Sequence, residues 1–270
     1  MKKVFISGSI SIKNLNPEVC KIIDDIINKN YQILVGDAHG VDALVQKYCV
    51  QKNYINLCVY YVDEQPRNLE SVNFLIKQVP PEKKGEVINV NNKNVKIGKK
   101  EQGFKDRKMA DDCDYAFAIW DEKSSGSFAN IQKCFKDNKF VKIWLNEQNR
   151  FALVCEKNPN DFYEIEQIYR NNSGYEKSEI RKLLADIYAG NSNFKSDKSF
   201  NEFLQNNKIM QKDGKNLTPC PAYAKYFIEK KIKQFLSYKF SVDMLEIIEK
   251  IVSNTAKNIN RLSLDFGDEI

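Results

Sequence analysis

Three loops in the first half of the chain are rich in glycine, serine and aspartate. They are Ser7–Ser11, Gly36–Asp42 and Asp121–Asn130, and each follows a run of apolar residues. Glycine lets the backbone come close to a phosphate, and backbone N–H groups and serine hydroxyls can hold that phosphate without a metal. Three such loops in one half of a chain together predict a site for a small phosphorylated ligand.

The last of these loops carries the strongest signal. Ser124, Ser125 and Ser127 supply hydroxyl donors, Gly126 permits close approach, and a helix from Phe128 offers unpaired amides at its start. The plainer alternative is a flexible, serine-rich connection. The combination of donors favours an anion-binding seat.

The second loop is a tight turn between a strand and a helix. Gly36 and Gly40 bracket the turn, and a helix that starts near Val41 points its positive end back at the loop. Asp42 lies in the first turn of that helix, so it can cap the helix or touch a ligand, and both roles stay open. His39 is expected beside the ligand rather than as a catalytic base.

The candidate ligand contacts come from these loops and from a charged pair that precedes the last of them. A charged cluster on a short helix is usually a solvated face. The case for Lys105 and Asp106 depends on their position ahead of the strand that ends in the last loop. The candidates are Gly8, Ser9, Gly36, Asp37, Gly40, Asp42, Lys105, Asp106, Ser124, Ser125, Gly126, Ser127 and Asn130.

The elements that must position these loops alternate between strand and helix. Short apolar runs predict five strands, and apolar residues at spacings of three and four predict the helices between them. Such alternation predicts a Rossmann-like α/β fold, a parallel sheet with helices on both faces and a ligand crevice at the carboxyl ends of the strands. The strands are Lys2–Gly8, Gln32–Gly36, Asn56–Val62, Tyr115–Trp120 and Phe140–Leu145; the helices are Pro17–Asn30, Val41–Gln51, Lys105–Asp111 and Phe128–Lys136.

A second, smaller and mainly helical domain is expected after a shift in composition near Asn146–Asp161. We place the domains at residues 1–147 and 160–270. The Asp213-Gly214 pair predicts a hairpin, and short helices followed by a hairpin have the outline of a winged helix. A further small hairpin is expected at Asn89–Gly98. The predicted helices are Tyr163–Tyr169, Lys177–Tyr188, Ser199–Asn206 and one long stretch, Ala222–Ile259.

Composition excludes several classes of protein. Of 270 residues 42% are hydrophobic, and no apolar run approaches the roughly 20 residues that a membrane span needs. The chain enters a strand directly after Met1, without a signal-peptide pattern, so we expect a cytoplasmic protein without a membrane partner. The net charge of +6 suits nucleotide or nucleic-acid partners without demanding them.

Cysteine and histidine usage argues against metal chemistry. The single histidine is His39, and the seven cysteines are scattered without a Cys-x-x-Cys pair. An odd number of cysteines without paired spacing is typical of reduced, buried thiols. We therefore expect no metal site and no bound cofactor.

The loops together resemble the SLOG superfamily. This Rossmann-like group includes the DNA-processing protein DprA and the Lonely Guy, or "lysine decarboxylase-like", nucleotide hydrolases. The resemblance covers about residues 1–147 and implies a nucleotide-type ligand bound across the three loops. Its motifs are Ser7–Ser9, Val35–Asp42, Arg67-Asn68, Lys105-Asp106 with Met109, and Asp114–Asn130.

The sequence departs from the hydrolase members at the residues that matter most for catalysis. Those members carry a Gly-Gly-x-Gly-Thr loop followed by a glutamate, whereas Ser124–Ser127 reads Ser-Ser-Gly-Ser and Asn130 stands near the position of the acid. An asparagine cannot act as a general acid or base. The resemblance therefore favours ligand sensing, with the second domain as responder. The alternative is an N-glycosidic hydrolase or transferase that uses Asp106 or Asp121, with Arg107 as a candidate supporting arginine.

Two further readings concern the second domain. The segment Phe200–Pro219 resembles the C-terminal domain of phage antirepressors, which makes DNA a candidate partner, but 16 Lys and Arg against 13 Asp and Glu over residues 171–270 is a weak basic excess. A helical dimerisation module is the alternative. A long apolar stripe on the predicted helix favours a homo-oligomer. Its residues are Phe227, Ile228, Ile232, Phe235, Leu236, Val242, Leu245, Ile248 and Ile251.

Overall fold

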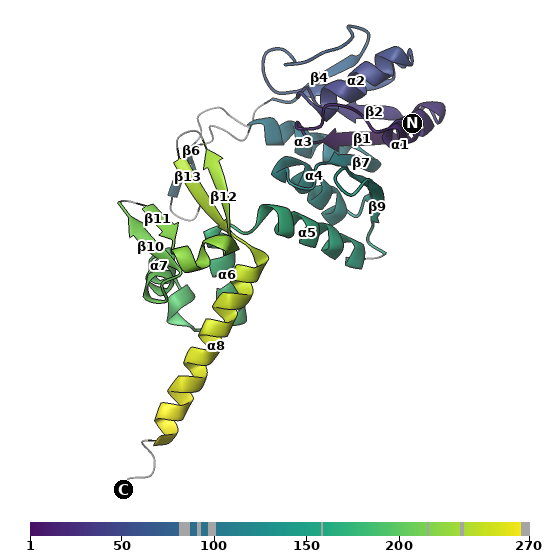
Figure 1. Cartoon of the computed structure of the whole chain (residues 1–270). Coiled ribbons are helices and arrows are strands. Elements are labelled where there is room, and N and C mark those ends of the chain that lie inside the picture. The colour runs from purple at the N-terminus through teal and green to yellow at the C-terminus, as the bar shows by residue number, and fades with distance from the viewer. Residues whose placement is uncertain are drawn as a thin grey trace. The chain divides into compact units, whose positions relative to one another are not determined.

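The computed structural model, shown in Figure 1, forms two compact units, Met1–Glu166 and Gln167–Ile270. The structure describes residues 1–80, 87–90, 93–96, 101–157, 159–214, 216–232 and 235–265.

The first unit is built on a seven-stranded sheet with the strand order β4-β3-β2-β1-β7-β8-β9. Neighbouring strands are parallel except β8 and β9, which are antiparallel. The Rossmann-like α/β fold predicted from the sequence is confirmed. The strands are β1 (Lys3–Gly8), β2 (Gln32–Val35), β3 (Leu57–Tyr61), β4 (Leu75–Gln78), β7 (Tyr115–Trp120), β8 (Phe140–Leu145) and β9 (Arg150–Val154).

Helices flank the sheet and bury its apolar side chains. The first helix begins as predicted, with Pro17 at its first turn and the Asn16 side chain accepting a hydrogen bond from the Glu18 N–H at 2.9 Å. Val19, Ile23 and Ile26 lie on its buried face. The helices are α1 (Pro17–Asn28), α2 (Val41–Gln51), α3 (Glu101–Asp112), α4 (Ser125–Lys136) and α5 (Pro159–Ser173), which continues into the second unit.

The order of the strands creates a switch point between β1 and β7. From β1 the chain adds β2, β3 and β4 on one side and then returns to place β7 on the other side of β1. Gly8 at the end of β1 pairs in register with Ile119 near the end of β7. Ligands of open α/β sheets bind outside the carboxyl ends of the strands at such a point. This topology therefore favours a ligand crevice between the loops that follow β1 and β7.

Two strands of the sheet lie outside the predicted set. β4 is an edge strand whose Leu75 and Ile76 are exposed, so no alternation of apolar and polar residues marks it. β9 pairs with β8 across a tight turn, and α5 follows it, so the first unit extends to Glu166. The hairpin expected at Asn89–Gly98 has its strands at β5 (Val87–Val90) and β6 (Lys93–Lys96). The asparagine pair at its turn lies outside the described residues.

The second unit contains helices and two hairpins around an aromatic core. Phe194, Phe200, Phe203 and Phe240 are all buried and make ring contacts with one another. The hairpin predicted at Asp213-Gly214 is confirmed, with Gly214 at a φ of 59°. The elements are α6 (Lys177–Ile187), η1 (Ser192–Phe194), α7 (Asp197–Asn206), β10 (Met210–Asp213), β11 (Asn216–Pro219), η2 (Pro221–Tyr226), β12 (Phe227–Ile232), β13 (Phe235–Phe240) and α8 (Val242–Asp265).

The long helix predicted over Ala222–Ile259 is wrong in its first half. β12 and β13 form an antiparallel hairpin in which Phe227 pairs with Phe240, their ring centroids 4.8 Å apart. Phenylalanine, isoleucine and tyrosine favour strands, and their spacing here fits a period of two as well as a helical one. The apolar stripe that favoured a homo-oligomer is thus divided between a hairpin and α8. On α8, Ile248 is buried in the unit's own core.

None of the helices in the described part of the chain has the length and apolar character of a membrane span.

Candidate functional site

Three serine hydroxyls converge where β1 and β7 end. Ser9 Oγ lies 2.6 Å from Ser124 Oγ and 3.3 Å from Ser127 Oγ, and the hydroxyl of Ser124 donates to Ser127 Oγ at 2.9 Å. We call Ser9, Ser124 and Ser127 the serine cluster. Ser9 and Ser127 are buried, and Ser124 is half-buried. The cluster thus joins the loop after β1 to the loop after β7.

Glycines allow the three predicted loops to meet. A Cβ on Gly8 would lie 2.4 Å from the carbonyl oxygen of Ile119, so no larger residue fits between β1 and β7. Gly40 has a φ of 76°, and a Cβ there would lie 2.5 Å from Cα of Ile10. The loop after β2 therefore lies directly against the loop after β1.

The amino end of α4 faces the same region. Ser124 is the N-cap residue, in extended conformation, and its side chain makes no capping hydrogen bond. The first amides of a helix have no partner within it and carry part of the positive end of its dipole. Ser125 and Gly126 are exposed there, and a Cβ on Gly126 would meet nothing within 4 Å. The first turn of α4 is therefore open to a ligand.

Asp121 shapes the loop and brings a negative charge to this end of α4. Its Oδ1 accepts hydrogen bonds from the N–H groups of Lys123 at 3.1 Å and Ser124 at 2.8 Å, and its Oδ2 accepts one from the Ser11 hydroxyl. Burial raises the pKa of this carboxyl, but these hydrogen bonds outweigh the burial and hold the pKa below its usual value. The charge of Asp121 opposes an anion in the seat, so the donors must outweigh it.

Four of the candidate residues form a charge cluster beside Gly36, together with Arg67. We define it as Asp37, Asp42, Arg67, Lys105 and Asp106. Lys105 Nζ lies 3.3 Å from Asp37 Oδ1, 3.4 Å from Asp106 Oδ1 and 3.9 Å from Asp42 Oδ2, although its side chain is only 3% exposed. Burial lowers the pKa of Lys105, and the three carboxylates outweigh that effect and raise it. Lys105 is therefore a buried counter-ion for three carboxylates.

Asp42 braces the second loop instead of capping α2. Its Oδ2 accepts a hydrogen bond from the Ala38 N–H at 3.0 Å, and α2 has no side-chain cap. Burial raises the pKa of Asp42 to about 6, although the charge of Lys105 opposes that shift. The sequence left two roles open for Asp42, helix capping and ligand contact. The observed contact is a structural one, as capping would be, since the carboxylate holds the turn.

Asp37 is fully buried. Its carboxylate accepts hydrogen bonds from the backbone and guanidinium of Arg67 and lies beside Lys105. Such a side chain offers no surface to a ligand. The accessible carboxylate of the charge cluster is Asp106, whose side chain is 29% exposed.

Two supporting residues were not among the candidate ligand contacts: Arg67, which the sequence analysis named only as part of a motif of the resemblance, and Gln46. Arg67 comes from the loop before β4, and Gln46 is a fully buried amide on α2. Gln46 donates to the Gly36 carbonyl at 3.1 Å and accepts from the Glu70 N–H at 3.0 Å, so it ties the second loop to the segment that carries Arg67. A glutamine among the apolar side chains of a helix is the one sequence signal that could have indicated this role.

The remaining predicted residues lie around these two clusters. His39 and Arg107 are exposed, and Asn130 is half-buried on α4. The Arg107 guanidinium lies 4.5 Å from the ring centroid of Phe104. The structure thus brings the serine cluster and the amino end of α4 together, with the second loop packed beside them and the charge cluster bracing that loop.

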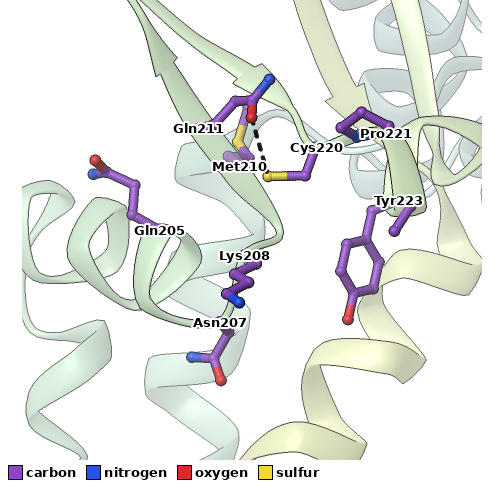
Figure 2. A pocket seen from close by; sticks show the side chains of 9 residues that line it. Gln205, Asn207, Lys208, Met210, Gln211, Cys220, Pro221 and Tyr223 are labelled. Atoms are coloured by element: carbon purple, nitrogen blue, oxygen red, sulfur yellow. Dashed lines mark hydrogen bonds between the residues drawn. The ribbon is translucent and has the colours of Figure 1, made fainter.

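The second unit contains a groove that was not predicted. Its volume is about 680 Å³, and it lies between the end of α7, the start of β10 and η2 (Figure 2). At the edge of the groove, the Cys220 thiol lies 3.9 Å from Gln211 Oε1. The lining residues are Gln205, Asn207, Lys208, Met210, Gln211, Cys220, Pro221, Ala222 and Tyr223.

The chain matches no protein-family model, no curated protein and no solved structure.

Proposed function

We propose that the first unit binds a nucleotide or a nucleotide-derived signal in the loops at the carboxyl ends of β1, β2 and β7. One observation carries this proposal. The serine cluster and the uncapped start of α4 lie together at the switch point of the sheet, where ligands of open α/β sheets bind. The resemblance to the SLOG superfamily supports the same ligand class.

The donors of this region suit a phosphate. Ser9 Oγ accepts a hydrogen bond from the Asp121 N–H at 3.0 Å, and its proton is directed to Ser124 Oγ, whose own proton goes to Ser127. Hydroxyls rotate, so members of the serine cluster can turn from one another toward an anion. Together with the first amides of α4 they form a set of donors of the kind that holds phosphates without a metal.

Two side chains could accept hydrogen bonds from a ribose. Asp106 has a partly exposed carboxylate, and Asn130 has a half-buried amide on the helix that starts at the seat. Carboxylates and amides accept hydrogen bonds from sugar hydroxyls. A nucleotide could use such acceptors as well as the phosphate donors, whereas a simple inorganic anion would use the donors alone.

Two other functions remain alternatives to binding and sensing. An N-glycosidic hydrolase or transferase would need a carboxyl that gives up or takes a proton near neutral pH. The hydrogen bonds that lower the pKa of Asp121 make it a poor acid, which leaves Asp106. A DNA-binding regulator would use the β10–β11 hairpin of the second unit.

Calorimetric titration of the full chain tests the proposal. The panel consists of AMP, ADP, a cyclic nucleotide and ADP-ribose, with adenosine as the control that lacks phosphate. We expect a dissociation constant on the order of micromolar or tighter for at least one phosphorylated member, and much weaker binding of adenosine. No heat from any member would overturn the proposal.

The response of the second unit is tested on the same sample. Light scattering with and without the bound nucleotide measures whether the 31.4 kDa chain associates with itself. Titration with duplex DNA at several salt concentrations tests the regulator reading, because phosphate contacts make affinity fall steeply with salt.

A further inference from the structure

The groove in the second unit is formed by three separate segments of the chain. Figure 2 shows Gln205, Asn207 and Lys208 on one side and Pro221 and Tyr223 on the other. The first group comes from the end of α7 and the residues after it, the second comes from η2, and the start of β10 lies between them. The volume of about 680 Å³ falls within the roughly 300–1,000 Å³ of ligand pockets in proteins. The groove is therefore large enough for a small ligand or for one unit of a polymer.

The positive charge of the second unit is concentrated on the segment that forms this groove. Residues 205–226 contain four lysines and one aspartate, whereas residues 171–204 contain five basic and five acidic residues and residues 227–270 contain seven of each. The excess of three positive charges over residues 171–270 thus belongs to one segment. The lining residues include no carboxylate, and Lys208 forms no ion pair with the residues that the structure describes. The groove therefore favours an anionic ligand.

Amide side chains give one side of the groove both donors and acceptors. Gln205 Nε2 donates to the Asn201 carbonyl at 3.0 Å, and Asn207 Nδ2 donates to the Phe203 carbonyl at 2.9 Å. These bonds fix both amides against α7. Each amide keeps its oxygen and a second N–H for a ligand. An acceptor and a donor on one side chain match the hydrogen-bonding edge of a nucleobase.

An aromatic ring faces these amides from the other side. Tyr223 is half-buried and lines the groove, and its ring centroid lies 6.5 Å from that of Tyr226. Lys225 Nζ lies 4.8 Å from the Tyr226 ring centroid. Bases stack on aromatic side chains, and neighbouring lysines attract the phosphates of the same strand. η2 thus combines rings and a cation in the way that proteins use to bind single strands.

We propose that this groove holds an unpaired nucleotide of a single-stranded nucleic acid. The base stacks on Tyr223 and forms hydrogen bonds with the amides of Gln205 and Asn207, and Lys208 contacts a phosphate. A base within a duplex has its pairing edge and both faces occupied, so it does not enter such a groove. The proposal concerns the second unit and does not rest on the nucleotide site proposed for the first.

The experiment measures the fluorescence anisotropy of labelled oligonucleotides of about 12 nucleotides during titration with the full chain. The probes are one RNA and one DNA strand of the same mixed sequence, and a duplex of that DNA. We expect a dissociation constant on the order of micromolar or tighter for at least one single strand, and binding of the duplex weaker by about tenfold or more. The comparison of RNA with DNA identifies the type of strand. No binding of either single strand, or equal binding of the duplex, would overturn the proposal.

The variants of Tyr223 test the stacking contact. Tyr223→Ala should weaken binding of the single strand by about 5- to 100-fold, because it removes the ring on which the base stacks. Tyr223→Phe retains the ring and should bind nearly as the parent does. Tyr163→Ala is the matched control, because Tyr163 is a 63% exposed tyrosine on α5, outside the groove, and its loss should leave binding unchanged.

Lys208→Asn tests the phosphate contact and keeps the proposal falsifiable if Tyr223→Ala does not fold. Lys208 is exposed with a φ of 53°, a conformation that asparagine adopts readily. Loss of one phosphate contact should reduce the slope of log affinity against log salt by about 0.7 for a single strand. Lys182→Asn, a change of an exposed lysine on α6, should leave affinity and slope unchanged. Parent-like binding by Lys208→Asn, or by folded Tyr223→Ala, would place the nucleic acid elsewhere on the chain, the first unit included, and contradict the proposal.

Discussion

The guanidinium of Arg67 forms an ion pair with the carboxylate of Asp37, which has no exposed surface. Arg67 Nη2 donates to Asp37 Oδ1 at 2.6 Å, and Nε donates to Oδ2 at 3.1 Å. The Arg67 N–H adds a third hydrogen bond at 3.0 Å. This bidentate pair joins the loop before β4 to the end of β2 and holds the second loop of the site in place.

Arg67→Ala should therefore destabilise the first unit. Asp37 would remain buried with Lys105 as its remaining charged neighbour. Removal of one member of a buried ion pair costs about 3–5 kcal/mol, and the partial exposure of Arg67 places the expected loss near 3 kcal/mol. Urea unfolding followed by circular dichroism measures this difference.

Arg150→Ala is the matched control for that measurement. Arg150 pairs with Glu164 at 2.5 Å, but both side chains are well exposed. Exposed pairs contribute about 0–1 kcal/mol, so this variant should unfold nearly as the parent does. Equal losses of unfolding free energy in Arg67→Ala and Arg150→Ala would mean that the burial of Asp37 does not make its ion pair more important for stability.

Asp42 predicts a specific dependence of stability on pH. Its folded pKa of about 6 lies above the value of about 3.9 for an unfolded aspartate, so the folded state binds the proton more tightly. Stability should then fall as pH rises from about 4 to about 6, by at most roughly 3 kcal/mol from this group. Asp37 has a lowered pKa and acts in the opposite sense only below about pH 4.

Asp42→Asn isolates this contribution. The amide oxygen can still accept the Ala38 N–H, but the side chain no longer titrates. Urea unfolding of parent and variant at about pH 4, 5, 6 and 7 should show the parent losing stability relative to the variant as pH rises. Parallel curves would show that Asp42 titrates normally.

The parts of the site that the sequence revealed are those that local pattern determines. The loops after β1, β2 and β7 could be predicted because glycine and serine directly follow apolar runs, and parallel strands bring their carboxyl ends to one edge. The partners of Arg67 and Gln46 cannot be read from local pattern, although Arg67 belongs to a motif of the resemblance and Gln46 is a glutamine among the apolar side chains of a helix. They depend on a loop before β4, an edge strand whose exposed Leu75 and Ile76 hide its periodicity.

The hairpin of β12 and β13 shows why the second unit was harder to predict from the sequence. Apolar residues from Phe227 to Phe240 satisfy both a helical and an alternating pattern, and helix was the wrong choice. Packing decides between them, since Phe240 is buried in the core beside Phe200 and pairs with Phe227. A sequence read segment by segment does not contain that packing.

Asn130 cannot act as a general acid or base, so turnover of a bound nucleotide would need a carboxyl group elsewhere in the site. The carboxyl of this region with a raised pKa, Asp42, is buried, and Asp121 is held ionised by its hydrogen bonds. We expect no release of free base from AMP at an enzymatic rate, as measured by chromatography after incubation with the full chain. Base release that disappears in Asp106→Asn would favour the hydrolase alternative.

Gly126 offers a direct test of the anion seat. It lies exposed in the first turn of α4, where an added side chain meets nothing within 4 Å, so substitution there should leave the fold intact. A carboxylate in this turn also suits the positive end of the helix, so the melting temperature of Gly126→Asp should change little.

Gly126→Asp should nevertheless abolish nucleotide binding. A carboxylate about 4 Å from a phosphate repels it by roughly 4 kcal/mol at the effective dielectric constant of a protein surface, which weakens binding by far more than tenfold. Gly126→Asn has almost the same shape without the charge and is the control, with a smaller loss expected. Calorimetry of both variants against the best nucleotide gives the two affinities. Equal affinities in the aspartate and asparagine variants would place the phosphate away from the amino end of α4.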